Sequence, residues 1–386
     1  MPSFNSENSP LEEPHTLQHE TDSGKFSLIR PGADSQKSLQ AWDAADSYLI
    51  DYYLSELSTV NVAVINDQFG ALGIALRKTV SYWISDSFCS HSALKQNLAH
   101  NQLSVSYPLF DPLEPWDTQV KAGIALIKLP KNLSFLTHLI NRCHSEGISN
   151  IYIAGMMKHL PKNILVFLQK FGEVNRLPFK KKATIYKLTL SPSLIESIRS
   201  NYPKQLHIGD IKLSTQANVF GRDKLDPGAA FVVENLTKLP KCNNVADLCC
   251  GSGILAIAYA KQNFNSSNAA KITLFDESFM AVQSSINSCE LNSIKDYEVH
   301  WDDGLKNNKQ KFDLILCNPP FHEEHTVGDY IAKRLFNDAK QHLTPNGSLV
   351  VVGNRHLGYH VTLKKYFKQV STLASNSKFI LLKANA

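Results

Sequence analysis

A repeated strand–turn–helix pattern constrains the fold of this chain more than any other feature. Residues 62–76, VAVINDQFGALGIAL, align without a gap with residues 245–259, VADLCCGSGILAIAY. In both stretches an apolar run leads through a turn that contains glycine into a second apolar run, which is typical of a buried strand followed by a helix. Two such stretches in one chain predict two α/β units of the same kind.

The segments that follow each stretch also match in pattern and order. The second half alternates strand-like and helix-like runs such as KITLFD, SFMAVQSSINSCELN and FDLILCN, and the first half has DSFCSHSALKQNLAHN and IALIKLPKNL in corresponding places. Any two α/β units share some of this rhythm, but matches in the same order favour duplication. We therefore expect an α/β fold of two tandem Rossmann-like units related by duplication, each with a largely parallel sheet covered by helices.

The chain of 386 residues is long enough for two domains. Pro192 and Pro203 interrupt the periodic pattern and place the boundary between the domains near position 200. We therefore expect one unit over residues 26–200 and a second over residues 201–386. Residues 1–25 are polar and acidic, which predicts a disordered tail.

The composition is that of an ordinary globular protein, with 43% hydrophobic and 19% charged residues. Lys and Arg outnumber Asp and Glu by 40 to 35, a mild excess that allows a polyanionic partner without requiring one. The seven cysteines include no CxxC pair, so free thiols are favoured over a disulfide framework or a metal site. Since no apolar run approaches the ~18 residues of a membrane span, we expect a cytoplasmic protein.

The second unit carries the features of a nucleotide site. Its first strand ends at Asp247 and turns through Gly251 and Gly253 into a helix, whose free N–H groups can bind an anionic group. Asp276 ends the next strand, where a carboxylate can accept hydrogen bonds from both ribose hydroxyls. The third glycine of the dinucleotide fingerprint is absent, which argues against NAD and leaves a mononucleoside cofactor.

Two further motifs end strands of the second unit. Asp302 and Asp303 follow YEVHW, and one of them could accept the amino group of an adenine, although a solvated loop carboxylate is an equal alternative. The motif NPPF, residues 318–321, follows FDLILC. Pro-Pro alone often only ends a strand. After a glycine turn with a correctly spaced acid, it instead indicates a stiffened catalytic loop.

These motifs resemble a known enzyme class. DLCCGSG, Asp276, the pair Asp302–Asp303 and NPPF, in this order, resemble class I S-adenosylmethionine-dependent methyltransferases that act on nitrogen. Over almost the whole chain, LQAWDAADSYL, GRDKLDPGAAF, LCNPPFHEEH and GNRHLGYHVTLKKYF resemble bacterial large-subunit ribosomal RNA guanine-N2 methyltransferases. A sister family that acts on small-subunit ribosomal RNA shares the duplicated layout.

The resemblance implies a division of labour between the units. The second would bind S-adenosyl-L-methionine and catalyse, while the first would be a degenerate copy that helps to recognise ribosomal RNA, with no membrane and no obligate protein partner. In the gapless alignment, Val64 stands at the place of Asp247 and Gln68 at that of Gly251, and we expect Leu129 at that of Asn318. The first unit should therefore neither bind the cofactor normally nor catalyse.

The NPPF motif has a clear chemical use on a guanine amine, which is a poor nucleophile because its lone pair is delocalised. The Asn318 side-chain oxygen can accept one amine hydrogen and the Pro319 carbonyl the other, and fixed proline φ angles aim that carbonyl in advance. Phe321 offers a face on which the extruded base can stack. His322 is a possible proton acceptor, but packing or RNA contact is the more common role.

Several other residues each have two alternative roles. Asp226 and Gly228 could wall the cofactor pocket or form a simple turn. Arg355 and His356 could face the target nucleotide or cap the sheet. The run at residues 180–182, three lysines, could contact phosphate or be a solvated face.

Two other functions compete with the leading hypothesis. A small-subunit guanine-N2 methyltransferase is the nearest enzyme, ahead of adenine-N6 or protein-amide methylation, which Phe321 and the duplicated first unit disfavour. A non-catalytic RNA-binding assembly factor is the alternative from another class. The intact Asp247, Gly251, Gly253 and Asn318 argue against lost catalysis.

Overall fold

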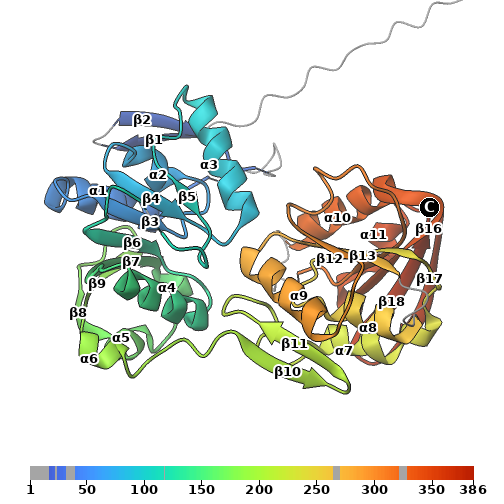
Figure 1. Ribbon diagram of the computed structural model, residues 1–386. Helices are drawn as coiled ribbons and strands as arrows, with labels where there is room; N and C mark the ends of the chain where they lie inside the picture. The colour runs from blue at the N-terminus through green and yellow to red at the C-terminus, as the bar shows by residue number, and fades with distance from the viewer. Residues whose placement is uncertain (1–16, 22–23, 32–39, 117, 264–269, 321–327) are drawn as a thin grey trace, which may run out of the picture.

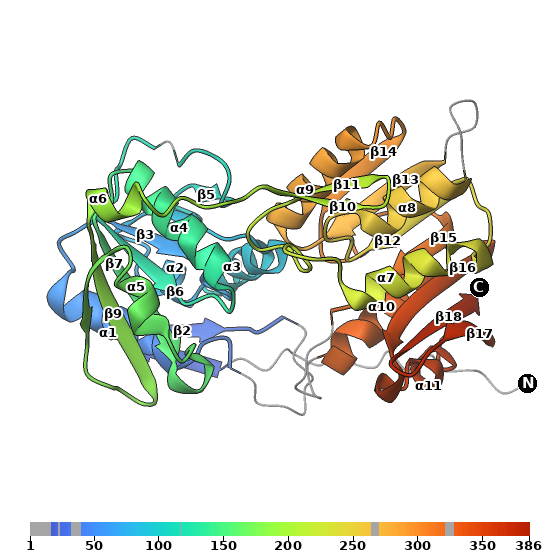
Figure 2. The ribbon, with the colours of Figure 1, turned by 90° about the horizontal axis from the view of Figure 1, so that it is seen from below.

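The computed structural model describes the chain except residues 1–16, 22–23, 32–39, 117, 264–269 and 321–327. Two α/β units lie side by side, and a two-stranded hairpin, β10 (Lys204–Ile208) and β11 (Ile211–Thr215), follows the first unit along the chain (Figure 1). Figure 2 shows the same pair of units from below, with α9 beside the first unit.

The two units contain seven-stranded sheets of the same topology. The orders are β5-β4-β3-β6-β7-β9-β8 and β14-β13-β12-β15-β16-β18-β17, in which β9 and β18 run antiparallel to both neighbours. The first sheet consists of β3 (Val62–Ile65), β4 (Val80–Ile84), β5 (Leu109–Phe110), β6 (Ile124–Lys128), β7 (Asn150–Met156), β8 (Gly172–Arg176) and β9 (Ala183–Leu190). The second consists of β12 (Asn244–Leu248), β13 (Lys271–Asp276), β14 (Tyr297–Trp301), β15 (Phe312–Cys317), β16 (Leu343–Asn354), β17 (Gln369–Ser375) and β18 (Phe379–Asn385). The shared order confirms the α/β fold of two like units.

The helices also occur in matching order. The first unit has α1 (Ala44–Glu56), α2 (Ala71–Ala75), α3 (Phe88–His100), α4 (Leu133–Ser145), η1 (Met157–His159), α5 (Ile164–Leu168) and α6 (Pro192–Ile195). The second has α7 (Pro227–Glu234), η2 (Leu236–Lys238), α8 (Ile254–Asn263), α9 (Phe279–Leu291), α10 (Gly328–His342), η3 (Arg355–Leu357) and α11 (Tyr359–Leu363). Among the described helices, none combines the length and the apolar character that a membrane crossing requires.

Both faces of each sheet are buried, as the continuous apolar strands predict. In β3, Ala63 and Ile65 belong to the cluster that contains Phe135 of α4, whereas Val64 belongs to the cluster that contains Tyr48 of α1. Successive side chains of a strand point to opposite faces, so one short run supplies both cores. The second sheet is packed between two clusters in the same way.

The backbone supports the gapless alignment of the two strand–turn–helix stretches. Asn66 and Cys249 occupy corresponding positions and both have left-handed φ angles, 63° and 59°. Gly70 and Gly253, which directly precede α2 and α8, have φ angles of 87° and 80°. Non-glycine residues rarely adopt this region, so the shared values indicate one turn geometry used twice.

One expectation about the N-terminal segment is wrong. Residues 17–21, which the composition assigned to a disordered tail, form β1 (Leu17–Thr21). This strand pairs antiparallel with β2 (Gly24–Leu28). β2 is anchored because its Leu28 is buried in a core cluster of the first unit. Backbone hydrogen bonds to β2 then hold the polar segment β1.

The units meet where β4 and β13 end. Phe88 N donates to Glu277 O, and Phe279 N donates to Asp86 O, both at 2.8 Å. Side chains of the second unit also complete a core cluster of the first, namely Ala217, Val219, Met280 and Ala281. The carboxyl edges of the two sheets therefore meet in a packed, hydrogen-bonded interface.

Candidate active site

The sequence-predicted site residues gather at the carboxyl edge of the second sheet. β12 pairs in parallel with β13 and β15, so the ends of these three strands are neighbours. Asp247 lies in β12, Asp276 is the last residue of β13, and Asn318 directly follows β15. Ligands of open α/β sheets bind at this edge, outside the strand ends.

The glycine turn after β12 leaves room beside its backbone. A Cβ atom on Gly251, whose φ is 58°, would meet no atom nearer than 4.0 Å, where Phe220 O and Val219 Cγ1 lie. A Cβ on Gly253 would instead approach Leu274 Cδ2 at 3.1 Å. Gly253 therefore packs against β13, whereas Gly251 faces open space, as a residue beside a bound cofactor should.

Two backbone hydrogen bonds fix the orientation of the Asp276 side chain. Its Oδ2 accepts from Gly251 N at 2.9 Å, and its Oδ1 accepts from Ser278 N at 3.0 Å. Burial raises the pKa of Asp276 to about 6, although both backbone donors favour the charged form. The carboxylate is held beside the glycine turn and retains lone pairs for hydroxyl donors.

Asp247 lies deeper than the sequence suggested. Its side chain is fully buried, and its Oδ2 accepts from Ala256 N in the first turn of α8 at 3.1 Å. Burial raises its pKa to about 7. Among the described side chains, its Oδ1 is one of the buried oxygens without a hydrogen-bond partner. Asp247 thus holds α8 to the strand beneath the glycine turn.

The adjacent acids after β14 differ in their surroundings. Asp303 is held by both terminal nitrogens of Arg334 in α10. Asp302 donates its backbone N–H to Asp276 O at 3.0 Å, and its Oδ1 accepts from Asn307 Nδ2 at 2.6 Å. Arg334 already neutralises Asp303, which leaves Asp302 as the better candidate for an adenine amino group.

The amide of Asn318 is held in one orientation by an acid distant in sequence. Asn318 Nδ2 donates to Asp226 Oδ2 at 3.0 Å, and the same oxygen caps α7 by accepting from Ala229 N at 2.9 Å. With its nitrogen bound, the Asn318 amide presents Oδ1, which is buried and has no partner in the described part of the chain. A Cβ on Gly228 would lie 2.9 Å from Asp226 Oδ2 and 3.4 Å from Asn318 Oδ1, so glycine lets the two side chains meet.

The remainder of the NPPF motif is partly described. Pro319 is buried and directly follows Asn318, so its carbonyl lies at the same strand end. Phe321 and His322 lie outside the described residues. Arg355 and His356 are exposed in η3, directly after β16, at the same edge of the sheet.

The first unit has a lysine where the second has its amide, which corrects the expectation of Leu129. Ile127 pairs with the end of β3 as Cys317 pairs with the end of β12, so Lys128 corresponds to Asn318. The sequence alignment of the loops after β6 and β15 was wrong by one residue, because the sequence pattern alone does not show at which residue β6 ends. Lys128 Nζ lies 2.6 Å from Asp43 Oδ1 and 2.8 Å from Asp46 Oδ1.

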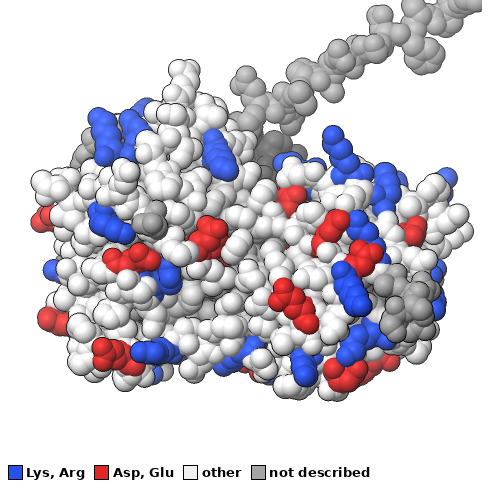
Figure 3. Space-filling model, viewed as in Figure 1, with Lys and Arg blue, Asp and Glu red and all other residues white. Residues whose placement is uncertain are grey.

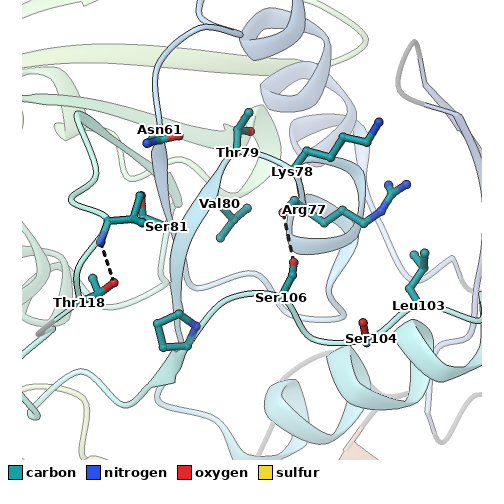
Figure 4. A pocket seen from close by; sticks show the side chains of 12 residues that line it. Asn61, Arg77, Lys78, Thr79, Val80, Ser81, Leu103, Ser104, Ser106 and Thr118 are labelled. Carbon is teal, nitrogen blue, oxygen red and sulfur yellow. Dashed lines mark hydrogen bonds between the residues drawn. The ribbon is translucent and has the colours of Figure 1, made fainter.

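A cavity of about 530 Å³ lies at the opposite edge of the first sheet, where β3 and β4 begin. Figure 4 shows Arg77 and Lys78 on one side of it and Thr118 on the other. Since ligands of such sheets bind at the carboxyl ends of the strands, this cavity is not part of the candidate site.

Comparison with known families decides the class. The methyltransferase small domain family matches residues 210–383, and the RLMG N-terminal domain family matches residues 16–192. Ribosomal RNA large subunit methyltransferase G of Stutzerimonas stutzeri is 36% identical over 95% of this chain and 98% of that protein. The chain belongs to the ribosomal RNA large subunit methyltransferase G family. The protein of that name from Shewanella amazonensis is 38% identical, over 93% of this chain and 96% of its own length.

A solved structure shares the architecture of this family member. The T. thermophilus 16S rRNA guanine-N2 methyltransferase, solved with AdoMet and guanosine, superposes with a TM-score of 0.70 at 17% identity. The match covers 96% of this chain and 98% of that one. It confirms the tandem arrangement of two methyltransferase-like units.

Sequence reasoning missed Phe220 and Asp86 at this edge, and it did not find the contact that Asp226 makes. Asp226 appeared as a pocket wall or a turn, but it orients Asn318 from 92 positions away. Phe220 is 70% exposed, and its carbonyl oxygen is one of the nearest atoms to a Cβ on Gly251. Asp86 of the first unit contacts the loop after β13. Phe220, which directly precedes GRDKLDPGAAF, was the one local signal, because the other two contacts join distant segments.

Proposed function

We infer that this chain transfers a methyl group from S-adenosyl-L-methionine to the exocyclic N2 of a guanine in large-subunit ribosomal RNA. The observation that carries the chemistry is the oriented amide of Asn318, whose nitrogen is bound by Asp226 and whose Oδ1 is free to accept. Membership of the large-subunit family supports the choice of RNA. The 16S enzyme of like architecture makes small-subunit RNA the alternative substrate.

The residues of the second unit fit the cofactor. The open space beside Gly251 and the fixed carboxylate of Asp276 would hold its nucleoside part, with Asp302 near the adenine. Asp247 would act indirectly by holding α8, and Asp303 would act by holding Arg334. The cofactor supplies a methyl group bound to a sulfonium, from which the neutral thioether is a good leaving group.

Asn318 would activate the guanine amine by accepting a hydrogen bond from one of its two N–H groups through Oδ1. The Pro319 carbonyl would accept a hydrogen bond from the second N–H group, so that the nitrogen lone pair is directed out of the plane of the ring. Such preorganised acceptors cost no reorganisation when the reaction occurs. No strong base is needed, because methyl transfer leaves the amine nitrogen cationic and acidic, so that its proton passes to water after the transfer.

The first unit would hold RNA through a basic surface at its carboxyl edge. Residues 157–162, which follow β7, and residues 176–182, which lead into β9, contain six cations and no acid; the cations are Lys158, Lys162, Arg176, Lys180, Lys181 and Lys182. The guanidinium of Arg176 lies 3.9 Å from the ring centroid of Phe179, which is 52% exposed. Cations with an exposed aromatic suit phosphate contact and base stacking. Figure 3 shows charges of both signs on the face in view, so a localised basic segment matters more than the net charge.

The deciding experiment is transfer of a tritiated methyl group onto unmodified large- and small-subunit ribosomal RNAs, followed by mapping of the labelled nucleotide. We expect label at N2 of one guanine in the large-subunit RNA. Label only in small-subunit RNA would favour the alternative substrate. Cofactor binding without transfer to either RNA would favour a non-catalytic assembly factor.

A further inference from the structure

The interface between the two units is nearly symmetric in its backbone. Residues 86–88 follow β4 and begin α3, and residues 277–279 follow β13 and begin α9. Ser87 and Ser278, the N-caps of these helices, form an antiparallel bridge. Equivalent segments of the duplicated units therefore meet across an approximate two-fold axis.

The side chains at this bridge are not symmetric. Asp86 of the first unit is 4% exposed, and its carboxylate accepts three hydrogen bonds, all from the second unit. The donors are Ser278 Oγ at 2.6 Å, Asn218 Nδ2 at 2.7 Å and Met280 N at 2.8 Å. Glu277, at the matching place in the second unit, has an exposed side chain that accepts from Ser87 Oγ at 2.5 Å.

The bonded loop of the second unit is the one that carries the ribose carboxylate. Ser278 donates its backbone N–H to Asp276 Oδ1 at 3.0 Å and its hydroxyl to Asp86 Oδ2. Met280 N, in the first turn of α9, donates to Asp86 Oδ1. The first unit thus fixes the segment from Asp276 to Met280 at two points, one on either side of the helix start.

The neighbouring strand end leans on the first unit as well. Trp301, which directly precedes Asp302, packs edge-on against Phe88 and His91 of α3, with ring centroids 5.7 and 4.9 Å away. Its Nε1 donates to Glu277 O at 2.8 Å. Both strand ends that carry the proposed ribose and adenine carboxylates are therefore braced by residues of the first unit.

We propose that Asp86 of the first unit is a positioning residue for cofactor binding, which acts through Ser278 on the carboxylate of Asp276. The proposal rests on the ribose role of Asp276 inferred above. Without the Asp86 carboxylate, the buried Met280 N and the partly buried donors of Ser278 and Asn218 lose their acceptor, and the loop has to rearrange to satisfy them. Preorganisation of Asp276 is then lost, and part of the cofactor's binding energy must be used to restore it. The first unit thereby contributes to cofactor binding in the second unit, although none of its own residues is assigned to the catalytic step.

The test is calorimetric binding of S-adenosylhomocysteine to the full chain, which requires no RNA. We expect Asp86→Ala and Ser278→Ala to raise the dissociation constant about tenfold. Ser87→Ala is the matched control, since it removes the equivalent contact on the other side of the bridge and should leave affinity unchanged. In the Asp276→Ala background, Asp86→Ala should add no further loss, because residues that act through one another are not additive.

Steady-state kinetics separate positioning from general destabilisation. Asp86→Ala should raise KM for S-adenosylmethionine and leave kcat at saturating cofactor near that of the wild type. Lowered kcat with an unchanged cofactor KM would overturn the positioning role. If Asp86→Ala does not fold, Ser278→Ala decides the question by the same measurements.

The outcomes distinguish this proposal from the assignment on which it rests. Wild-type affinity in Asp86→Ala and Ser278→Ala, with weakened binding in Asp276→Ala, would overturn the proposal and leave the ribose assignment intact. Unchanged binding in Asp276→Ala would remove the ribose assignment and the proposal together. Additive losses in the double variant would show that Asp86 does not act through Asp276 and would also overturn it.

Discussion

The pair Asp226–Asn318 allows the proposed activation of the guanine amine to be tested without disturbing the fold. Asp226 Oδ2 has two tasks, since it caps α7 through Ala229 N and holds Asn318 Nδ2. Serine is as good an N-cap as aspartate, but its shorter side chain does not reach Asn318 in addition. Asp226→Ser should therefore keep the cap and release the amide, whereas Asp226→Asn keeps an oxygen for both donors.

The expected magnitudes follow from these contacts. Asn318→Ala removes the acceptor itself and should lower kcat by ~10²–10³, as the loss of one preorganised polar group does in other active sites. Asp226→Ser leaves the acceptor in place but lets the amide rotate, so we expect a smaller fall of ~10-fold to 10²-fold. Asp226→Asn should stay within a few-fold of the wild type. Since the lost hydrogen bond contributes ~1 kcal/mol to stability, all three variants should fold.

The assay is single-turnover methyl transfer to large-subunit RNA at saturating cofactor, with calorimetry of S-adenosylhomocysteine binding as the control. Cofactor affinity should stay close to wild type in all three variants, because neither Asp226 nor Asn318 is assigned to the nucleoside. A wild-type rate in Asn318→Ala would refute the acceptor role. A wild-type rate in Asp226→Ser, with Asn318→Ala impaired, would refute the argument that Asp226 orients the amide.

Three further predictions concern the cofactor, the amide pocket and the RNA surface. Hydroxyl donors favour the ionised form of Asp276, whose pKa burial raises to about 6, so cofactor binding should lower this pKa. Affinity should then be constant above pH 6 and fall up to ~tenfold per pH unit below it, as calorimetry between pH 5 and 8 would show. Asp276→Asn should lose this dependence. Gly228→Ala should raise helix stability by up to ~1 kcal/mol yet lower kcat, because its Cβ would lie 2.9 Å from Asp226 Oδ2; thermal unfolding with turnover measures both. The double variant Lys181→Ala, Lys182→Ala should bind RNA more weakly, and the slope of log K against log salt concentration should fall by roughly 1 to 2. Lys187→Ala, within the sheet, is the comparison variant. An unchanged slope in the double variant would contradict phosphate contact.

The local parts of the site were predictable from the sequence because each is a strand end. An apolar run followed by GSG or NPP fixes where the strand stops, and parallel pairing then brings Asp276 and Asn318 to one edge. The depth of Asp247 was not predictable, since the same pattern serves an acid that faces a ligand and an acid that holds the helix.

The contacts that orient these residues could not be predicted from periodicity. Asp226 meets Asn318 from a helix cap 92 positions earlier, and Asp86 meets Ser278 from the other unit, 192 positions away. A repeating apolar pattern specifies which face of a strand or helix is buried, but it does not specify which polar group lies opposite. The same limit explains why residues 17–21 were assigned to a tail, because their strand is polar and is held by its partner.

At the ends of β6 and β15, the fourth strands of their units, the same arrangement of an aspartate and a strand-end residue has opposite results. In each, an aspartate that caps the helix before the first strand receives a hydrogen bond from the residue at that strand end: Asp226 from Asn318, and Asp43 from Lys128. An amide that donates through its nitrogen still has an oxygen to offer, whereas an ammonium has donors only. Lys128 therefore closes the position in the first unit. The change is costly to reverse, because Lys128 and Asp46 form a largely buried ion pair and removing one member leaves the other charge uncompensated. With Gln68 also in place of Gly251, a Lys128→Asn variant should restore neither cofactor binding nor catalysis to the first unit, which is consistent with a unit kept for RNA and for the support that Asp86 gives to its neighbour.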